Sequence, residues 1–131
     1  MKTFLPVLNF ALMAFGAPQL LAQSFETFSY GDSARHKLDV FAQNAEADVP
    51  VVVFVHGGGW SVGRKSQHQF IGKMFQSQGY VAVVINYRLF PESTFPGFPE
   101  DAAAAVAWVT ENIEAHGGDP DCAGGPAVLP L

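Results

Sequence analysis

Three consecutive glycines lie between a histidine and a tryptophan in the segment His56-Gly57-Gly58-Gly59-Trp60, directly after a run of β-branched residues. Because glycine has no Cβ atom, backbone N–H groups in such a segment can come close to a bound molecule. Donors of this kind stabilise the oxyanion that forms when an acyl carbonyl is attacked, by about 3 kcal/mol each. The alternative to this oxyanion-binding role is that the segment is simply a tight loop over a sheet. A phosphate cradle is excluded, because the sequence has neither a Walker lysine nor a Gly-x-Gly-x-x-Gly opening into a helix.

The same loop contains a serine in a suggestive setting. Residues 59–63 read Gly-Trp-Ser-Val-Gly and fit the pattern Gly-x-Ser-x-Gly, in which the serine is a nucleophile at a sharp turn directly between a strand and a helix. Here the strand is expected to end near Val55 and the next helix to begin near Ser66, so Ser61 is predicted to lie in mid-loop. We therefore reject Ser61 as the nucleophile and assign no catalytic residue.

Metal chemistry has little support in the sequence. The four histidines are scattered without a spaced pair of ligands, and Cys122 is the single cysteine, which excludes an intrachain disulfide. His68 and His116 fall on segments expected to be helical, and we predict that both are surface residues. Neither a metal nor a cofactor is expected.

Composition and charge narrow the class of protein. A chain of 131 residues with 49% hydrophobic and 15% charged residues indicates one folded domain or less. The net charge is -5, and no basic stripe is present to neutralise phosphates. Nucleic acid is therefore not an expected partner.

Residues 1–22 have the layout of a secretory signal peptide. One positive charge precedes an uncharged apolar run, residues 4–17, and cleavage is predicted after Ala22, with Gly16 or Ala17 as alternatives. A buried helix or a membrane anchor would also be apolar, but the run is interrupted and short for a membrane span of about 20 residues. The sequence predicts a secreted or periplasmic protein without a stable membrane span.

The rest of the chain alternates predicted strands and helices. Segments with alternating or continuous apolar residues indicate strands, and segments with helical spacing between a capping residue and a glycine indicate helices. The expected strands are 24–30, 36–41, 49–55 and 80–85, and the expected helices are 66–79 and 100–115. This order predicts an α/β fold, in which an antiparallel hairpin leads into a mostly parallel sheet with flanking helices.

Several motifs in this order resemble the α/β-hydrolase superfamily. More narrowly, they are similar to the His-Gly-Gly-Gly esterases, which include hormone-sensitive-lipase-like, feruloyl and acetyl-xylan esterase-like enzymes. The motifs are 50–60, 79–89, Phe95-Pro96, Glu100-Asp101, 107–109 and 117–120. The resemblance makes residues 23–121 the N-terminal half of an α/β-hydrolase domain. It implies a carboxylic-ester hydrolase that uses Ser, His and an acid on a small-molecule ester, without a cofactor.

The resemblance also implies roles for individual residues. The N–H groups of Gly58 and Gly59 correspond to oxyanion-hole donors in the loop after the third strand. The residues implied to shape that loop are His56, Gly57 and Trp60. His56 is not the catalytic histidine, which follows the nucleophile along the chain in this family. Arg88 and Asp101 are implied to be structural tethers.

After Asp121 the sequence departs from the family pattern. The family continues into a fifth strand and the nucleophile elbow, whereas residues 122–131 contain two prolines, two glycines and no serine. We expect this non-family tail to form no strand and the chain as given to be inactive. We also expect the strand at 51–55 to expose an edge that allows self-association. A frameshift, a premature stop or a mis-joined gene model would explain the change, as would a natural short relative with its own tail.

Two classes of function follow from these observations. The first is an ester hydrolase, for which feruloyl, acetyl and short aliphatic esters or an arylformamide are all open as substrates. The second is a non-catalytic secreted α/β module that binds a ligand or a complementary fragment.

Overall fold

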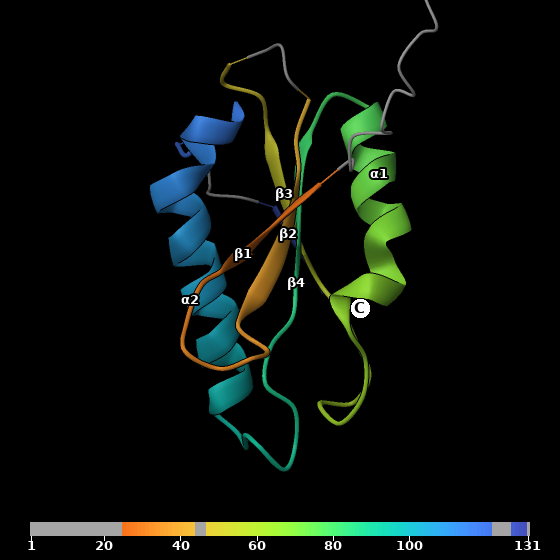
Figure 1. Ribbon diagram of the computed structural model, residues 1–131, viewed down its shortest axis with the longest axis vertical. Coiled ribbons are helices and arrows are strands. Elements are labelled where there is room, and N and C mark those ends of the chain that lie inside the picture. The colour runs from red at the N-terminus through yellow and green to blue at the C-terminus, as the bar shows by residue number, and fades with distance from the viewer. Residues whose placement is uncertain (1–24, 44–46, 122–126, 131) are drawn as a thin grey trace, which may run out of the picture.

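The computed structural model describes residues 25–43 and 47–121 and the backbone of residues 127–130. The signal peptide predicted for residues 1–22 lies outside this part of the chain. The strands are β1 (Glu26–Ser29), β2 (Lys37–Phe41), β3 (Val51–Val55), β4 (Val81–Ile85) and β5 (Ala127–Pro130). The helices are α1 (Gln69–Ser77) and α2 (Gly97–Asn112), with 3-10 turns η1 (Lys65–His68) before α1 and η2 (Ile113–His116) after α2. The two long helices cover opposite faces of one sheet (Figure 1).

The sheet has the order β1-β2-β4-β3-β5. β1, β2 and β4 pair antiparallel, while β4, β3 and β5 pair parallel. The predicted hairpin and the predicted β-α-β unit, formed by β3, α1 and β4, are both present. The expected α/β architecture is therefore confirmed, and its parallel part is the half of the sheet that contains β3.

The prediction that the tail forms no strand is wrong for residues 127–130. These residues form β5 parallel to β3, with Val52 opposite Ala127 and Val55 opposite Pro130. A proline is tolerated there because it stands at the end of an outermost strand, where a missing N–H interrupts little of the ladder. The edge of β3 is consequently covered, and the outer edge of the sheet lies on the short strand β5.

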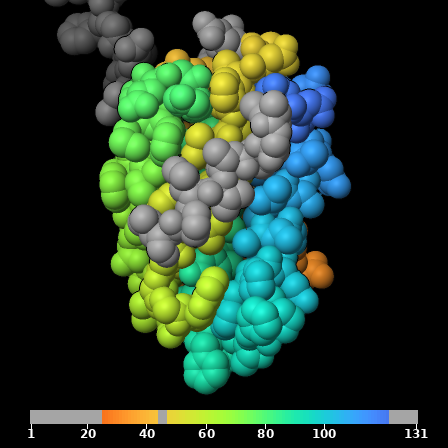
Figure 2. All heavy atoms as spheres, turned by 180° about the vertical axis from the view of Figure 1, so that it is seen from behind, coloured from red at the N-terminus to blue at the C-terminus, as the bar shows by residue number. Residues whose placement is uncertain are grey.

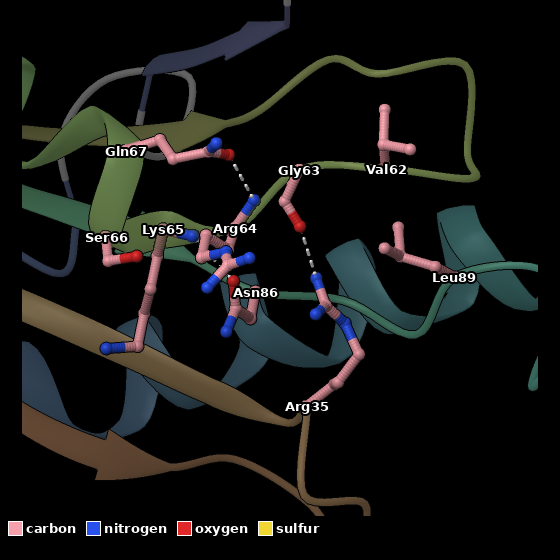
Figure 3. Close-up of a pocket in the computed structure, with 9 residues that line it drawn as sticks. All are labelled: Arg35, Val62, Gly63, Arg64, Lys65, Ser66, Gln67, Asn86 and Leu89. Carbon is pink, nitrogen blue, oxygen red and sulfur yellow. Dashed lines mark hydrogen bonds between the residues drawn. The ribbon is translucent and has the colours of Figure 1, made fainter.

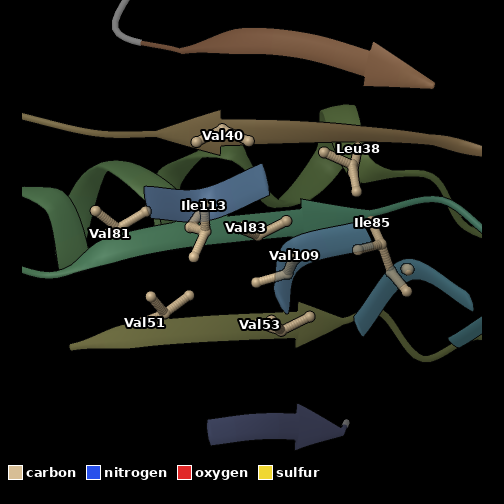
Figure 4. Close-up of a cluster of buried hydrophobic side chains, with 10 residues drawn as sticks. Leu38, Val40, Val51, Val53, Val81, Val83, Ile85, Val109 and Ile113 are labelled. Atoms are coloured by element: carbon tan, nitrogen blue, oxygen red, sulfur yellow. The ribbon is translucent and has the colours of Figure 1, made fainter. Parts of the chain in front are cut away.

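Both faces of the sheet carry apolar side chains, because successive residues of a strand point to opposite faces. The larger cluster lies between the sheet and α2, where Ala105, Val109 and Ile113 pack against the strands (Figure 4). Its strand members are Leu38, Val40, Val51, Val53, Val81, Val83 and Ile85. On the other face, Ile71 and Phe75 of α1 pack against a cluster made by Phe41, Phe54, Ala82 and Val84.

The helix starts differ from the predicted ones. α2 begins at Gly97 instead of residue 100, and Pro99 lies in its first turn. A proline is compatible with a first turn because the N–H groups there have no partner within the helix. Ser66 does not begin a regular α-helix but lies within η1, and α1 starts at Gln69.

Gly72 is the buried residue of α1 and lies against the sheet. A Cβ atom added at Gly72 would lie 2.4 Å from ring atoms of Phe41, which is fully buried. Gly72→Ala should therefore force α1 and β2 apart and lower the free energy of unfolding by about 1–3 kcal/mol, although alanine favours helix. Urea denaturation measures this change. Lys73→Ala, an exposed position on the same helix, is the control, and an equal midpoint for both variants would contradict the packing.

Candidate functional site

The glycine loop follows the carboxyl end of β3 and lies beside the segment that follows β4. Figure 2 shows the two segments next to each other at one end of the molecule, in yellow-green and teal. The backbone N–H of Phe90 donates to the carbonyl of Trp60 at 2.8 Å, which joins them directly. Ligands of open α/β sheets bind outside the carboxyl ends of the parallel strands. The loop is therefore in the position where a functional site is expected.

His56 fixes the first peptide unit of the loop. Its Nδ1 lies 2.8 Å from the carbonyl oxygen of Gly57. A carbonyl oxygen can only accept a hydrogen bond, so Nδ1 carries the proton and donates it. A trans peptide is planar, and its N–H points opposite to its C=O. Because the Gly57 carbonyl points toward the His56 ring, the N–H of Gly58 points away from it.

The next peptide unit is fixed by a tight turn. The carbonyl of Gly58 accepts hydrogen bonds from the N–H groups of Ser61 and Val62, both at 3.2 Å. A Cβ atom on Gly58 would lie 2.1 Å from the Val62 carbonyl oxygen, and the φ angle of Gly58 is +126°. Only glycine fits this position. By the same peptide geometry, the N–H of Gly59 points away from the turn.

Two adjacent N–H groups are thus left without acceptors. Within residues 25–43 and 47–121, the hydrogen bonds of Gly58 and Gly59 use their carbonyl groups and not their N–H groups. Both residues are exposed. The loop can therefore present two oriented donors to a negatively charged oxygen.

Trp60 forms an apolar wall next to these donors. Its φ angle is +65°, a conformation that is strained for a residue with a bulky side chain. The indole stacks on Phe98 at a ring distance of 5.0 Å and contacts the edge of Tyr87 at 5.8 Å. Half of Trp60 remains exposed, so the ring can still contact a bound molecule.

The environment of His56 keeps its imidazole neutral. The side chain is buried, stacks on Tyr87 at 4.5 Å, and its backbone carbonyl accepts a hydrogen bond from the Tyr87 hydroxyl at 2.7 Å. Burial lowers the pKa of His56, and the charge of Arg35 acts in the same direction, while the bond to Gly57 opposes them. Burial also raises the pKa of Tyr87, which keeps its hydroxyl protonated as a donor. His56 is therefore suited to orient the loop and not to act as a general acid or base.

Ser61 has a structural partner. It lies in the loop between β3 and η1, and its hydroxyl donates to the carbonyl of Gly59 at 2.9 Å. In the described part of the chain, no histidine or carboxylate forms a hydrogen bond with Ser61. Its hydroxyl bonds within the loop, while the turn itself is closed by the backbone N–H groups of Ser61 and Val62.

The prediction that His68 is a surface residue is wrong. The His68 ring is half-buried and packs against Phe54 at 5.2 Å and against His56 at 5.9 Å, nearly parallel to the latter. Its Nδ1 is buried without a hydrogen-bond partner among the described residues. His116 is also half-buried and meets the ring of Phe28 at 5.0 Å. Sequence periodicity missed His68 because η1, and not a regular helix, brings its ring onto β3.

Arg88 and Asp101 join the segment after β4 to α2. The side-chain nitrogens of Arg88 lie 2.7–3.2 Å from both carboxylate oxygens of Asp101, and the Arg88 backbone N–H donates to the same carboxylate at 2.9 Å. His36 Nε2 lies 3.1 Å from Asp101 Oδ1. Burial alone would raise the pKa of Asp101, but the hydrogen bonds from Arg88 and His36 outweigh it and hold this pKa below its ordinary value.

The described residues contain no group of three or more His, Cys, Asp or Glu side chains that could hold a metal ion. No helix among the same residues is both long and apolar enough to cross a membrane.

Comparison with known families gives one consistent answer. The model of the BD-FAE family matches residues 38–124. Among curated proteins, the chain is 37% identical over 93 residues to the isoprenylcysteine alpha-carbonyl methylesterase ICME of Arabidopsis thaliana, covering 70% of this chain and 22% of that protein. It is 42% identical over 74 residues to the carboxylesterase NlhH of Mycobacterium tuberculosis, covering 56% of this chain and 23% of that protein.

Solved structures agree with these relatives. Esterase B from Lactobacillus rhamnosis superposes with a TM-score of 0.68 at 26% identity, over 82% of this chain and 35% of that chain. A hyperthermophilic esterase from Pyrobaculum calidifontis gives a TM-score of 0.62 at 34% identity, over 72% and 30%. The fold is therefore that of the α/β hydrolases. The chain spans 20–24% of the length of the curated methylesterases it matches.

Asp101→Asn tests the tether between the segment after β4 and α2. At pH 7 the free energy of unfolding of the variant should be about 2 kcal/mol lower than that of the unsubstituted chain, because hydrogen bonds to a charged partner are lost. The pKa of Asp101 is lower in the folded than in the unfolded chain, so its stabilisation is complete above about pH 5 and disappears as the pH falls through the folded pKa.

Urea denaturation of both proteins at several pH values measures this effect. The difference between them should shrink between about pH 5 and pH 2. A difference that stays constant over this range would exclude the ionised Asp101 as its source.

Proposed function

The chain belongs to the BD-FAE family, an α/β-hydrolase esterase family, and on this basis we propose that it forms the oxyanion-binding part of a carboxylic-ester hydrolase. The observation that carries the proposal is the pair of unpaired N–H groups of Gly58 and Gly59 at the carboxyl end of β3. Both peptide units are held in place, one by His56 and one by the turn at Ser61 and Val62. Donors fixed before the reaction need no rearrangement when charge develops.

In the proposed reaction, a nucleophile attacks the carbonyl carbon of an ester, and the carbonyl oxygen becomes an oxyanion. The N–H groups of Gly58 and Gly59 donate to this oxygen, and each contributes about 3 kcal/mol to stabilising the transition state. Trp60 contacts the apolar part of a small-molecule ester. His56 and Gly57 keep the donors oriented.

The nucleophile, its histidine and its acid are proposed to lie outside the described residues. The family resemblance implies a serine for this role, with an acyl-enzyme intermediate. Ser61 does not fit, because its hydroxyl is bonded to the Gly59 carbonyl and not to an imidazole. The lack of a bond between Ser61 and an imidazole also favours the second candidate function, a module that binds an ester or an anion without turnover.

Export is a further part of the proposal. It is supported by the uncharged apolar run of residues 4–17 and the small residue Ala22 at the predicted cleavage site. Amino-terminal sequencing of the protein recovered from the producing cells tests it, and an intact Met1 in the mature protein would contradict it.

The proposed role of the loop is tested in a chimera in which residues 38–121 replace the matching segment of a carboxylesterase relative. His56→Phe retains a flat ring for Tyr87 but removes the donor to the Gly57 carbonyl, so the N–H of Gly58 loses its fixed direction. We expect kcat on p-nitrophenyl butyrate to fall about 100-fold, with KM nearly unchanged. Ser61→Ala is the matched control and should retain most of the activity.

Two outcomes would contradict the proposal. An unchanged kcat in the His56→Phe chimera would show that the orientation of the loop does not contribute to catalysis. If the 131-residue chain alone hydrolyses the ester and Ser61→Ala abolishes this turnover, Ser61 is the nucleophile after all. Absence of turnover in the chain alone, with an active chimera, is the expected pattern.

A further inference from the structure

A pocket of about 510 Å³ lies where the carboxyl-terminal part of the glycine loop meets the segments after β4 and before β2. A volume of this size is in the range of small-molecule sites. Its lining includes Arg35, Arg64 and Lys65 and no acidic residue (Figure 3). The donors Gly58 and Gly59 do not line it. The pocket is therefore separate from the ester site proposed above.

Arg35 brings a positive charge without a carboxylate to balance it. Its Nε donates to the carbonyl of Tyr87 at 2.7 Å and its Nη2 to the carbonyl of Gly63 at 2.8 Å, and both acceptors are neutral. Among the described residues, no acidic side chain forms an ion pair with Arg35. A guanidinium group has five N–H donors, so three are left after these two bonds.

Arg64 adds a second positive charge. Its side chain is exposed and has no ion pair with any described residue. In Figure 3 its guanidinium group lies in the middle of the labelled residues, between Lys65 and Asn86. Lys65 does not contribute its charge in the same way, because its Nζ lies 2.6 Å from the buried carboxylate of Asp39.

The amide side chains of the pocket are oriented as donors. Asn86 Oδ1 accepts the backbone N–H of Lys65 at 2.6 Å, and Gln67 Oε1 accepts the backbone N–H of Arg64 at 3.1 Å. These bonds occupy the acceptor atoms and leave the two NH₂ groups for a ligand. The polar lining thus offers donors and positive charge, which is the complement of an oxyanion.

One end of the pocket is apolar. Val62, which is 63% exposed, and the half-buried Leu89 lie together at the end opposite Ser66 and Gln67 (Figure 3). A purely inorganic anion would make no contact with these two apolar side chains. The pocket therefore fits a molecule with a charged head and an apolar tail.

We propose that this pocket binds an amphiphilic organic oxyanion, with its carboxylate or phosphate head on Arg35 and Arg64 and its alkyl or aryl tail against Val62 and Leu89. Arg64 is the residue to vary, because its exposed side chain forms no ion pair with any residue that the structure describes. Arg35 is less suitable, because it also supports the carbonyls of Tyr87 and Gly63.

Isothermal titration calorimetry of the 131-residue chain tests the proposal with four probes: octanoate, octyl phosphate, inorganic phosphate and the neutral octyl glucoside. We expect one molecule of octanoate or octyl phosphate per chain, and their ratio of affinities shows whether carboxylate or phosphate is preferred. Octyl glucoside should bind at least about tenfold more weakly, since it lacks the charge. Inorganic phosphate should also bind more weakly, since it lacks the tail.

Arg64→Gln should weaken binding of both amphiphilic anions about tenfold and reduce the loss of affinity on adding salt. Lys73→Gln removes the same charge from an exposed position outside the pocket and should leave binding unchanged. Binding of these probes is measured on the 131-residue chain and ester hydrolysis on the chimera, so failure of one proposal is distinguishable from failure of the other. Equal binding by Arg64→Gln and Lys73→Gln, or equal affinity for octyl glucoside and octanoate, would overturn the proposal.

Discussion

The hydrogen bond between His56 Nδ1 and the Gly57 carbonyl is the interaction on which the geometry of the glycine loop depends. It requires a proton on Nδ1 and a correctly turned ring, and the ring is held in place by neighbouring chain segments. The parallel register places Val55 opposite Ile85. Beyond these strand ends, the ring of His56, the first residue after β3, stacks on that of Tyr87, the second residue after β4. The Tyr87 hydroxyl then holds the backbone of His56 from the other strand. The contacts between His56 and Tyr87 thereby set the direction of the Gly58 N–H, while the turn at Ser61 and Val62 sets that of Gly59.

A second set of contacts anchors the surrounding segments to one another. Arg35, just before β2, binds carbonyls from both the glycine loop and the segment after β4. Arg88, directly after Tyr87, forms a two-pronged ion pair with Asp101 of α2, and His36 reaches the same carboxylate. Geometry of this kind is the strong form of a salt bridge. Four elements that are distant in sequence therefore converge on the carboxyl ends of β3 and β4, which gives a loop rich in glycine a rigid base.

The sequence predicted the parts of this arrangement that depend on local pattern. The β-branched runs at 51–55 and 81–85 indicated strands because both faces of the sheet are covered, and the distance from Val55 to the next helix correctly predicted that Ser61 lies in a loop. The parts that depend on tertiary contact were missed. Stacking of His68 on His56 has no periodic signature, and β5 forms in a segment whose prolines and glycines argued against a strand because β3 offers it an edge to pair with. The roles of Gly58 and Gly59 rested on family resemblance, since spacing alone cannot distinguish an oriented donor from a tight turn.

The loop from Gly57 to Gly63 takes part in both proposed sites, and the structure indicates how far they influence each other. Its first half directs N–H groups outward, whereas at its other end the Gly63 carbonyl faces Arg35. Arg35 therefore links the two sites electrostatically, because its charge helps to lower the pKa of His56. An anion bound to Arg35 would weaken that contribution. Burial, however, is the larger cause of the lowered pKa of His56 and is unaffected by such a ligand. The Nδ1 proton that holds the Gly57 carbonyl is present in the protonated imidazole as well, so the Gly58 N–H would keep its direction. The loop can thus carry two anion-recognising surfaces with little interference, because one is built from oriented backbone and the other from side-chain charge.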